Sequence, residues 1–382
     1  MSEDLTIIWT ALIPLVAAGV VSFAVSPLVR QFAHTVGAID VPRDERRMHK
    51  TPIPRLGGLA IFLGFFASVL IFTGIDRSLQ GILLGSVVII VLGVIDDIVR
   101  LPAWIKFIVQ IGAALIPVFH GVIIERFSIP FSFDSEAYVN LGALSVPLTV
   151  LWIVAITNSV NLIDGLDGLA VGVSAISSVS LLIISIVTKQ PNITPVIAAL
   201  VGSCVGFMPY NLNPAKMFMG DTGATFLGFV LAAVSVTGLF KFYNLISFAV
   251  PFLLLALPIF DTVSAIVRRV SHGKSPMSPD RSHVHHKLID MGFSQKQSVA
   301  ILYTLSSVLA LAAVVLTTSG EVKTMLFILA VIVAVALSSR LFGRRAKKKE
   351  EIEVRNEELE ESPEPAKVIP PEENVAPEDI QP

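Results

Sequence analysis

Long stretches of uncharged, apolar residues recur along this 382-residue chain and constrain its fold more than any other feature. A helix needs about 17 to 25 predominantly apolar residues to cross the hydrocarbon core of a bilayer. Backbone polar groups in lipid must be paired internally, so each stretch is predicted to form a helix. The sequence contains eleven such stretches, at 5–28, 56–75, 79–95, 105–122, 141–160, 169–187, 193–209, 224–240, 245–267, 299–317 and 325–341.

The composition agrees with an all-α polytopic membrane protein of about eleven transmembrane helices. Hydrophobic residues make up 53% of the chain and charged residues only 15%, whereas soluble proteins carry about 25% charged residues. Most of the stretches lack a charged face, which argues against a large soluble helical protein. The acidic start, MSEDLTIIW, lacks the basic region of a cleavable signal peptide and is predicted to begin the first membrane anchor.

The distribution of lysine and arginine predicts the orientation of the chain. If the N-terminus lies outside and the eleven stretches alternate, only five of the 28 basic residues fall in outer segments. Cytoplasmic loops of membrane proteins carry an excess of basic residues. The sequence therefore predicts an outer N-terminus and a cytoplasmic C-terminus.

Two segments differ from the apolar stretches. The alternating pattern of ERFSIPFSF within 123–140 is typical of strands and predicts a small external β-hairpin. The C-terminal residues begin with a basic cluster and continue as an acidic, proline-rich tail that lacks the apolar surface to fold. The expected organisation is a transmembrane domain at 1–342 and a charged, disordered cytoplasmic tail at 343–382.

Five polar segments interrupt the apolar stretches, and the predicted orientation places all of them at the cytoplasmic face. They are DERRMHKTPIPRLGG (44–58), GVIDDIVRLPAWIK (93–106), NLIDGLDGLA (161–170), NLNPAKMFMGDTGATFLG (211–228) and SPDRSHVHHKL (278–288). The outer loops are chemically plain. Five polar segments at one face predict an active site at the membrane surface.

The segment NLIDGLDGLA places two carboxylates between two apolar stretches. A carboxylate at bilayer depth costs about 2.5–3.5 kcal/mol on insertion scales, and ionisable groups there usually serve function. Asn158, Asn161, Asp164 and Asp167 are three residues apart, so they form one polar stripe on a helix or follow a helix broken at the intervening glycines. A simple helix cap needs one such residue, so four of them favour a functional site.

Two other polar segments have plainer explanations. Asp96 and Asp97 end an apolar stretch, and a solvated helix end with Arg100 as a surface ion pair explains them when they are taken alone. Asp221 in MGDTG begins a stretch, and an N-cap explains it about as well as a catalytic role does.

The histidines at 283, 285 and 286 resemble a zinc cluster. Structural zinc takes four ligands, usually with cysteine among them, and no cysteine is near. A phosphate clamp that combines these histidines with Arg281 and Lys287 fits the residue types better.

The polar residues as a set point to magnesium and phosphate. Carboxylate and amide oxygens are hard ligands that suit Mg²⁺, and basic residues beside them hold phosphate groups. At a membrane face, this combination suits a reaction between a water-soluble nucleotide and a lipid phosphate.

Four motifs resemble those of the polyprenyl-phosphate sugar-1-phosphate transferases. The paired DD, the NxxNxxDGxDGL run, the NPAxxFMGDxG segment and the DRxHxHH loop occur in the expected order over most of residues 1–340. The loop DRSHVHHKL is similar to the N-acetylglucosamine-1-phosphate branch, whereas the muramoyl-pentapeptide branch typically has three consecutive histidines there.

The resemblance implies a reaction, partners and a location. The reaction is Mg²⁺-dependent transfer of GlcNAc-1-phosphate from UDP-GlcNAc to undecaprenyl phosphate, with release of UMP. This is the first lipid-linked step of a cell-envelope polymer such as teichoic acid or O-antigen. The expected location is the bacterial plasma membrane, with membrane lipid as a partner and the active site at the cytoplasmic face. No nucleic acid partner is expected, and a homodimer is left open.

The resemblance also implies roles at the phosphate end of the site. Asp221 and Asn161 are expected to hold Mg²⁺, for which Mn²⁺ is expected to substitute. Lys106 is expected to contact phosphate, and Asp96 or Asp97 to orient or deprotonate the lipid phosphate.

Further roles carry over to the nucleotide and sugar. Asn211 and Phe218 are expected to contact uracil, and Asp164 and Asp167 to order the nucleotide pocket. The expected clamp on the diphosphate and the sugar consists of Arg281, His283, His285 and His286.

Three alternatives remain open from the sequence. A phospho-MurNAc-pentapeptide transferase shares most of the motifs. A polytopic transporter has glycine-broken helices as well, but its polar groups lie near the bilayer midplane and often in inverted repeats, and no repeat is visible here. A membrane scaffold has no need of five polar segments on one side.

Overall fold

The computed structural model describes residues 3–42, 51–128, 138–238, 245–273 and 283–319, together with Ser275 and Phe327. The chain divides into two units, Met1–Met325 and Leu326–Pro382. Only Phe327 is described in the second unit, so the fold presented here is that of the first. The predicted eleventh stretch at 325–341, apart from Phe327, and the predicted tail at 343–382 lie outside the described residues.

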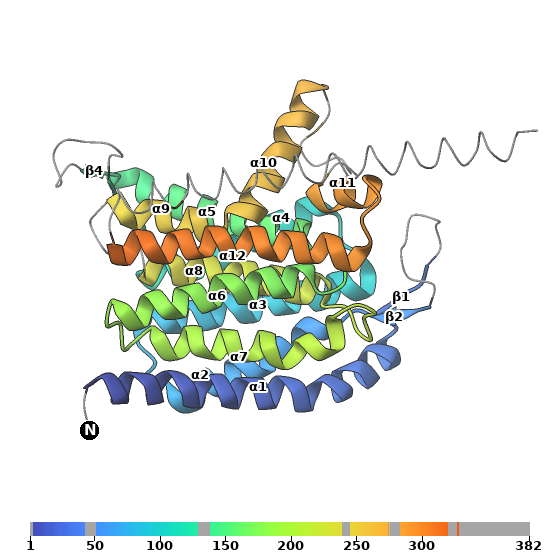
Figure 1. The fold of residues 1–382 in the computed structure, drawn as a ribbon, viewed down its shortest axis with the longest axis horizontal. Helices are drawn as coiled ribbons and strands as arrows, with labels where there is room; N and C mark the ends of the chain where they lie inside the picture. The colour runs from blue at the N-terminus through green and yellow to red at the C-terminus, as the bar shows by residue number, and fades with distance from the viewer. Residues whose placement is uncertain are drawn as a thin grey trace, which may run out of the picture. The chain divides into compact units, whose positions relative to one another are not determined.

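The described part of the first unit is almost entirely helical (Figure 1). A short 3-10 turn at Gly142–Leu144 precedes the fifth helix. The helices are α1 (Glu3–Val36), α2 (Gly57–Phe72), α3 (Arg77–Val99), α4 (Ala103–Phe119), α5 (Ser145–Leu162), α6 (Leu169–Val187), α7 (Thr194–Asn211), α8 (Gly220–Gly238), α9 (Leu245–Leu254), α10 (Ala256–Ser271), α11 (Val284–Asp290) and α12 (Gln295–Ser319).

Six described segments are long and apolar enough to cross a membrane, which confirms the prediction of a helical, multi-pass membrane protein. They are Trp9–Val36, Arg77–Val99, Gly142–Leu162, Leu169–Val187, Gly220–Gly238 and Gln295–Thr318. The helices α2 and α4 are apolar but shorter. The number eleven and the orientation stay predictions.

The predicted ninth stretch, 245–267, is wrong as a single helix. It consists of α9 and α10, and the chain turns at Leu255 so that α10 leaves the bundle at a steep angle (Figure 1). Pro258 has no N–H to donate to the carbonyl of Leu254 four residues earlier. The hydroxyl of Ser177 in α6 donates to that carbonyl at 2.7 Å, so the break leaves this backbone group paired.

The helix α1 extends beyond its predicted end at residue 28 and packs closely along α7. Arg30 and Gln31 continue the helix because both are good helix formers. Gly202 and Gly206 of α7 form a GxxxG pattern, and a Cβ at either position would collide with the backbone of α1. Small residues of this kind let membrane helices approach closely.

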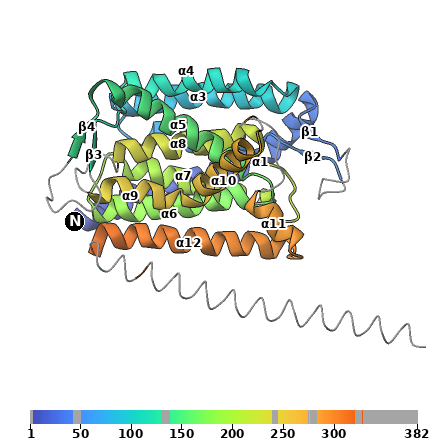
Figure 2. The same ribbon diagram turned by 90° about the horizontal axis from the view of Figure 1, so that it is seen from above.

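The helix α8 lies in the middle of the bundle. It packs against α2, α3, α5 and α6, and nearly all of its residues are buried (Figure 2). Its first turn carries Asp221. The position of this carboxylate is therefore set by the most enclosed helix of the unit.

Two small antiparallel sheets lie at opposite ends of the helices (Figures 1 and 2). The strands β3 (Arg126–Ser128) and β4 (Tyr138–Asn140) form the strand pair predicted within 123–140. The strands β1 (Ile39–Asp40) and β2 (Ile53–Pro54) form a second pair, which the sequence pattern did not predict. The pair β1–β2 and α11 lie at one end of the bundle, and β3–β4 lies at the other end with the start of α1.

Candidate active site

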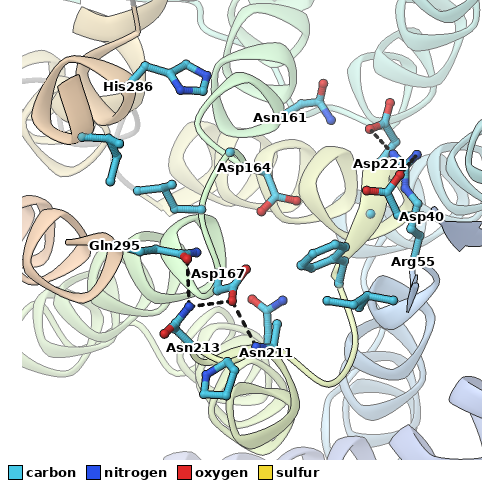
Figure 3. Close-up of a pocket in the computed structure, with 18 of the residues that line it drawn as sticks. Asp40, Arg55, Asn161, Asp164, Asp167, Asn211, Asn213, Asp221, His286 and Gln295 are labelled. Carbon is cyan, nitrogen blue, oxygen red and sulfur yellow. Dashed lines mark hydrogen bonds and ion pairs between the residues drawn. The ribbon is translucent and has the colours of Figure 1, made fainter. Parts of the chain in front are cut away.

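A cavity of about 540 Å³ lies at the end of the bundle that holds β1, β2 and α11 (Figure 3). Its walls come from β1–β2, the turn after α5, the α7–α8 connection, α11 and the start of α12. The polar and charged residues that line it are Asp40, Thr51, Arg55, Asn161, Asp164, Asp167, Asn211, Asn213, Asp221, His286, Asp290 and Gln295. Four of the five polar segments thus meet in one cavity, and the fifth lies directly behind Asp221.

The end of α5 and the turn that follows it bring three predicted residues to this cavity. The helix α5 ends at Leu162, and α6 begins after Gly168, whose φ of 79° suits glycine. Of the two possibilities left open by the sequence, a continuous helix with a polar stripe and a helix broken at the glycines, the structure shows the broken helix. Asn161, Asp164 and Asp167 line the cavity, while Asn158 stays within α5 and donates to Gln110 of α4 at 2.6 Å.

Asp167 links the turn to the α7–α8 connection. The side-chain amide of Asn213 donates to Asp167 Oδ2 at 2.9 Å and to Gln295 Oε1 at 2.8 Å. The backbone N–H of Ala215 donates to the same Asp167 oxygen at 3.0 Å. One carboxylate oxygen of Asp167 therefore holds the loop in place.

Asn211 ends α7, and Phe218 lies on the connection that follows it. The amide nitrogen of Asn211 donates to the Met217 carbonyl at 3.0 Å, while its buried Oδ1 finds no hydrogen-bond donor among the described residues. A buried acceptor without a donor is costly, so Asn211 Oδ1 suits a ligand that brings an N–H group. The N–H of Phe218 donates to the carbonyl of Pro54 at the end of β2 at 2.8 Å, and its carbonyl accepts the N–H of Gly57 at the start of α2 at 2.9 Å.

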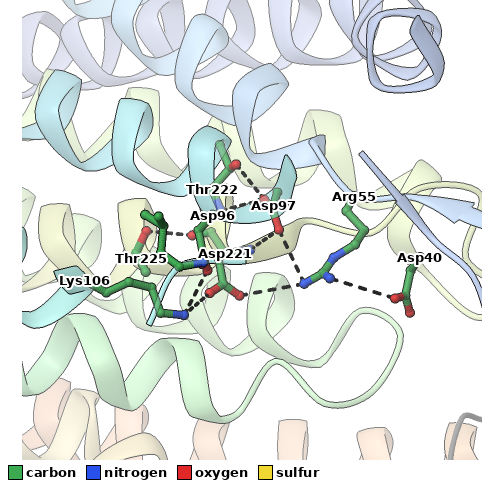
Figure 4. A network of polar contacts seen from close by, with 9 residues as sticks. Asp40, Arg55, Asp96, Asp97, Lys106, Asp221, Thr222 and Thr225 are labelled. Atoms are coloured by element: carbon green, nitrogen blue, oxygen red, sulfur yellow. Dashed lines mark hydrogen bonds and ion pairs between the residues drawn. The ribbon is translucent and has the colours of Figure 1, made fainter. Parts of the chain in front are cut away.

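Asp221 lies between two cations at the other side of the cavity (Figure 4). Lys106 Nζ is 2.9 Å from Asp221 Oδ2 and 2.9 Å from Asp96 Oδ2. Arg55 approaches Asp221 Oδ1 at 4.0 Å and Asp97 Oδ1 at 3.4 Å. The sequence segments 44–58, 93–106 and 211–228 thus converge on one charged cluster.

Asp97 caps the first turn of α8 from another helix. Its Oδ1 accepts the N–H of Asp221 at 3.1 Å, and its Oδ2 accepts the N–H and the hydroxyl of Thr222 at 3.0 and 2.7 Å. Its side chain has no exposed surface. Asp96 is buried as well, accepts the N–H of Leu101 at 2.6 Å and binds Lys106. Neither carboxylate lines the cavity.

The three histidine rings lie next to one another, with centroids 5.7 Å apart for His283 and His285 and 4.3 Å apart for His285 and His286, but their partners differ. His283 Nδ1 lies 2.8 Å from Asp261 Oδ2, and Asp261 Oδ1 accepts the N–H of Val284 at 2.8 Å. His283 and His285 are both buried, and only His286 lines the cavity. Arg281, the remaining member of the predicted clamp, lies outside the described residues.

Two groups near the cavity have displaced pKa values. Burial, and then the negative charge of Asp221, raises the pKa of Asp164 to about 7. Burial, and then the neighbouring His286, lowers the pKa of His285 to about 4. Burial thus favours the neutral form of Asp164, a nearby cation would favour its charged form, and His285 is neutral at pH 7.

The residues around Asp221 fit a magnesium ion that is completed by substrate. Among the described residues, no three His, Cys, Asp or Glu side chains form a metal-binding group. Mg²⁺ commonly takes only one or two carboxylates from a protein, with water and substrate phosphates as its other ligands. Asp221 and the amide oxygen of Asn161 both line the cavity and offer such a partial set.

Comparison with known proteins identifies the family. The model of glycosyl transferase family 4 matches residues 79–239. The probable undecaprenyl-phosphate N-acetylglucosaminyl 1-phosphate transferase of Bacillus subtilis (strain 168) is 40% identical over 312 residues, which are 81% of this chain and 85% of that protein. This chain belongs to the polyprenyl-phosphate N-acetylglucosaminyl-1-phosphate transferase family.

More distant relatives agree with this family assignment. The decaprenyl-phosphate N-acetylglucosaminephosphotransferase of Mycobacterium tuberculosis (strain H37Rv) is 36% identical over 79% of this chain and 81% of that protein. The undecaprenyl-phosphate α-N-acetylglucosaminyl 1-phosphate transferase of Escherichia coli (strain K12) is 27% identical over 74% of this chain and 77% of that protein. The resemblance inferred from the four motifs is confirmed.

In this transferase, the sequence motifs missed several residues that line the cavity. The sequence assigns Arg55 only to the basic residues that set the orientation, and it assigns no role to Asp40, Asn213 or Gln295. Arg55 and Asn213 lie within polar segments already singled out, so their residue types were a usable signal. Asp40 and Gln295 join the site only through tertiary contacts.

Proposed function

We propose that this transferase moves GlcNAc-1-phosphate from UDP-GlcNAc to undecaprenyl phosphate at the cytoplasmic face of a bacterial plasma membrane, with release of UMP and with Mg²⁺ as cofactor. The product would be the first lipid-linked intermediate of a cell-envelope polymer. The observation that carries the proposal is the division of one cavity into a charged end around Asp221 and an amide-lined end around Asn211.

The amide-lined end suits the base of the nucleotide. Uracil has one N–H donor on its ring, which complements the buried Asn211 Oδ1 that lacks a donor among the described residues. Phe218 offers an aromatic ring for stacking on the base. The loop that carries both residues is held by Asp167, Asn213 and Gln295, so the pocket is formed before ligand binds.

The charged end suits the diphosphate. In the proposed reaction, an oxygen of the lipid phosphate bonds to the sugar-bearing phosphorus, and the bond from that phosphorus to the bridging oxygen breaks, so that UMP leaves. When bound at Asp221 and Asn161, Mg²⁺ would neutralise charge on the phosphates. A phosphate monoester has a second pKa near 6. The acceptor is therefore mostly a dianion at pH 7, and Lys106 is proposed to orient phosphate oxygens rather than to move a proton.

An apolar groove beside α5 suits the isoprenoid chain of the acceptor. Its volume is about 310 Å³, and its walls include Leu151, Trp152 and Ile156 of α5 and Val263 and Ile266 of α10. The helix α5 continues from this groove to Asn161 near its C-terminal end. A chain lying in the groove would therefore bring its phosphate toward the charged end of the cavity.

The direct test uses labelled UDP-GlcNAc, undecaprenyl phosphate and the purified protein in detergent or vesicles. Label should move into butanol-extractable lipid, with one UMP released per lipid formed. EDTA should abolish the transfer, and Mg²⁺ or Mn²⁺ should restore it. Asp221→Asn serves as the inactive control.

Other results would point to the alternative functions. Transfer from UDP-MurNAc-pentapeptide but not from UDP-GlcNAc would assign the peptidoglycan branch. Labelled UDP-GlcNAc that crosses the vesicle membrane intact would indicate a transporter. If a folded protein supplied with lipid gives no lipid product and no transport, the proposed enzyme activity is wrong.

A further inference from the structure

Arg55 is built into the wall of the cavity by backbone contacts. It directly follows β2, and its N–H donates to the carbonyl of Ala38 at 3.0 Å. A Cβ at Gly220 would collide with the carbonyl of Arg55, and Gly220 has a φ of 72° that favours glycine. The backbone of Arg55 is thus packed directly against the residue that precedes Asp221.

The side chain of Arg55 is held only loosely by its carboxylate neighbours. Its nitrogens lie 3.4 Å from Asp97 Oδ1, 4.0 Å from Asp221 Oδ1 and 3.9 Å from Asp40 Oδ1. All three distances exceed the 2.7–3.2 Å of ordinary N–H···O hydrogen bonds. Lys106, in contrast, contacts two carboxylates at 2.9 Å.

The position of Arg55 gives its guanidinium access to a ligand. The side chain is 24% exposed and lines the cavity. Figure 4 shows it on the side of Asp221 opposite Lys106. A guanidinium offers five N–H donors in a planar fork that matches phosphate oxygens. The three surrounding carboxylates keep the fork near the cavity without using its donors at short range.

The charges of the cluster also favour a phosphate together with a divalent cation. Four carboxylates face two cations, in a set that consists of Asp40, Asp96, Asp97, Asp221, Arg55 and Lys106. Binding of a divalent cation at Asp221 would balance the formal excess of two negative charges. Arg55 would then be less strongly attracted to Asp221 and could turn toward an incoming anion.

We propose that Arg55 is a phosphate-binding residue of this site, which grips phosphate oxygens on the side of Asp221 opposite Lys106. The inference rests on the proposed function for the source of the phosphate, which is either the diphosphate of the sugar nucleotide or the monophosphate of the lipid acceptor. Both sources present the same oxygens to the guanidinium, and separate measurements distinguish them.

The test compares Arg55→Gln and Arg55→Lys with the wild-type protein. Calorimetry with UDP, UMP and uridine in the presence of Mg²⁺ measures donor-side binding without lipid. Steady-state kinetics measures the KM for undecaprenyl phosphate. Arg77→Gln is the matched control. Arg77 begins α3, at the end away from Asp96 and Asp97, and donates to the Phe119 carbonyl at 3.3 Å.

If Arg55 binds the donor diphosphate, Arg55→Gln should weaken the binding of UDP at least about tenfold, because charge-assisted hydrogen bonds to phosphate are lost. The binding of UMP should weaken less, and the binding of uridine should hardly change. If Arg55 binds the acceptor, nucleotide binding should stay unchanged and the KM for lipid phosphate should rise at least about tenfold. Arg55→Lys keeps the charge and should show a smaller loss in the same measurement. Arg77→Gln should match the wild type.

Two results would overturn the role of Arg55. Unchanged binding of UDP and unchanged KM for the lipid would exclude it, as would an equal loss for UDP and uridine, which marks a structural role. If Arg55→Gln does not fold, Arg55→Lys replaces it. A loss of UDP binding without a loss of uridine binding in Arg55→Lys then supports the phosphate-binding role, and equal losses exclude it. A wild-type protein that binds UDP through Arg55 but forms no GlcNAc lipid would reject the proposed function and leave the Arg55 site intact.

Discussion

At the scale of single residues, the partners of Asp97 determine its role. The sequence presents Asp96 and Asp97 as an equivalent pair, but only Asp97 accepts hydrogen bonds from the first turn of α8. Both of its oxygens accept hydrogen bonds from N–H and hydroxyl donors of α8, and Asp97 itself does not line the cavity. We therefore interpret Asp97 as a positioning residue that holds Asp221, rather than as a group that contacts the lipid phosphate.

This interpretation predicts that Asp97→Asn loses both stability and turnover. Both carboxylate oxygens of Asp97 accept hydrogen bonds, whereas an asparagine has only one acceptor oxygen. The substitution therefore leaves a buried N–H without an acceptor, which costs about 1–3 kcal/mol of stability. Turnover should fall about 10- to 100-fold because Asp221 shifts. Thermal unfolding and the dependence of rate on Mg²⁺ and pH measure these effects.

Asp221→Asn provides the comparison for that experiment. It should abolish turnover with a smaller loss of stability, because its side chain is not part of the cap. Raising the pH should not restore Asp97→Asn. A variant that kept the wild-type melting temperature and recovered its rate at high pH would instead identify Asp97 as a proton acceptor.

His285 predicts a particular pH dependence of stability. Its pKa is about 4 in the folded protein, against 6.5 when unperturbed. As the pH falls below about 6.5, His285 binds a proton in the unfolded chain but not in the folded protein. The free energy of unfolding therefore decreases between pH 6.5 and pH 4. His285→Gln cannot titrate and should lack this loss, which amounts to about 1–2 kcal/mol between pH 7 and pH 5.

Melting temperatures of wild type and His285→Gln across pH 5–8 test this expectation. The wild type should lose its advantage over the variant as the pH falls. A constant difference over the whole range would show that His285 titrates normally. Binding measurements are not needed, because the effect is on folding.

At the scale of elements, carboxylates from other helices hold the helices that carry the site. Asp97 of α3 caps α8, and Asp261 of α10 accepts the first N–H of α11 and contacts His283. The helix N-terminus carries a partial positive charge that a carboxylate neutralises. Each cap ties a site-bearing helix to a neighbour, so α3 helps to set the position of Asp221 and α10 helps to set that of His286.

The contact between α1 and α7 supports a prediction at this scale. Gly202→Ala should destabilise the protein by about 1–3 kcal/mol, because the added methyl group meets the backbone of Leu15 and forces the helices apart. Gly112→Ala is the matched control, since nothing lies within 4 Å of a Cβ there. It should be neutral or stabilising by up to about 1 kcal/mol. Thermal unfolding in detergent measures both, and equal losses would contradict the close packing.

At the scale of the whole helical unit, the polar segments meet at one end. The distribution of basic residues predicts that this end faces the cytoplasm. The native cysteine, Cys204, is buried, so an introduced cysteine can report accessibility with little background. Asn192, between α6 and α7, and Lys296, at the start of α12, are both exposed.

The orientation predicts opposite labelling of Asn192→Cys and Lys296→Cys. In intact cells, a membrane-impermeant maleimide should label Asn192→Cys only. After permeabilisation, Lys296→Cys should be labelled as well. The reverse order would invert the orientation and place the site outside, where UDP-GlcNAc from the cytoplasm does not reach it.

Sequence alone determined the class of fold and the family, because both depend on local properties. A run of apolar residues must form a helix in lipid wherever its neighbours lie, so most helices fall within a few residues of the predicted stretches. The motifs around Asp164 and Asp221 identified the family in the same way, since each is a short segment with its own chemistry. The break at Leu255 leaves no mark in the apolar pattern, because the residues on both sides of it are apolar.

Tertiary structure alone decided what each polar residue does. Asp96 and Asp97 are neighbours in sequence, yet one binds Lys106 and the other caps α8, because adjacent side chains on a helix point in different directions. His283, His285 and His286 lie next to one another, yet His283 contacts Asp261 whereas His286 lines the cavity. Arg55 reaches Asp221 only because glycines let two backbones meet, and such long-range contacts leave no local pattern in the sequence.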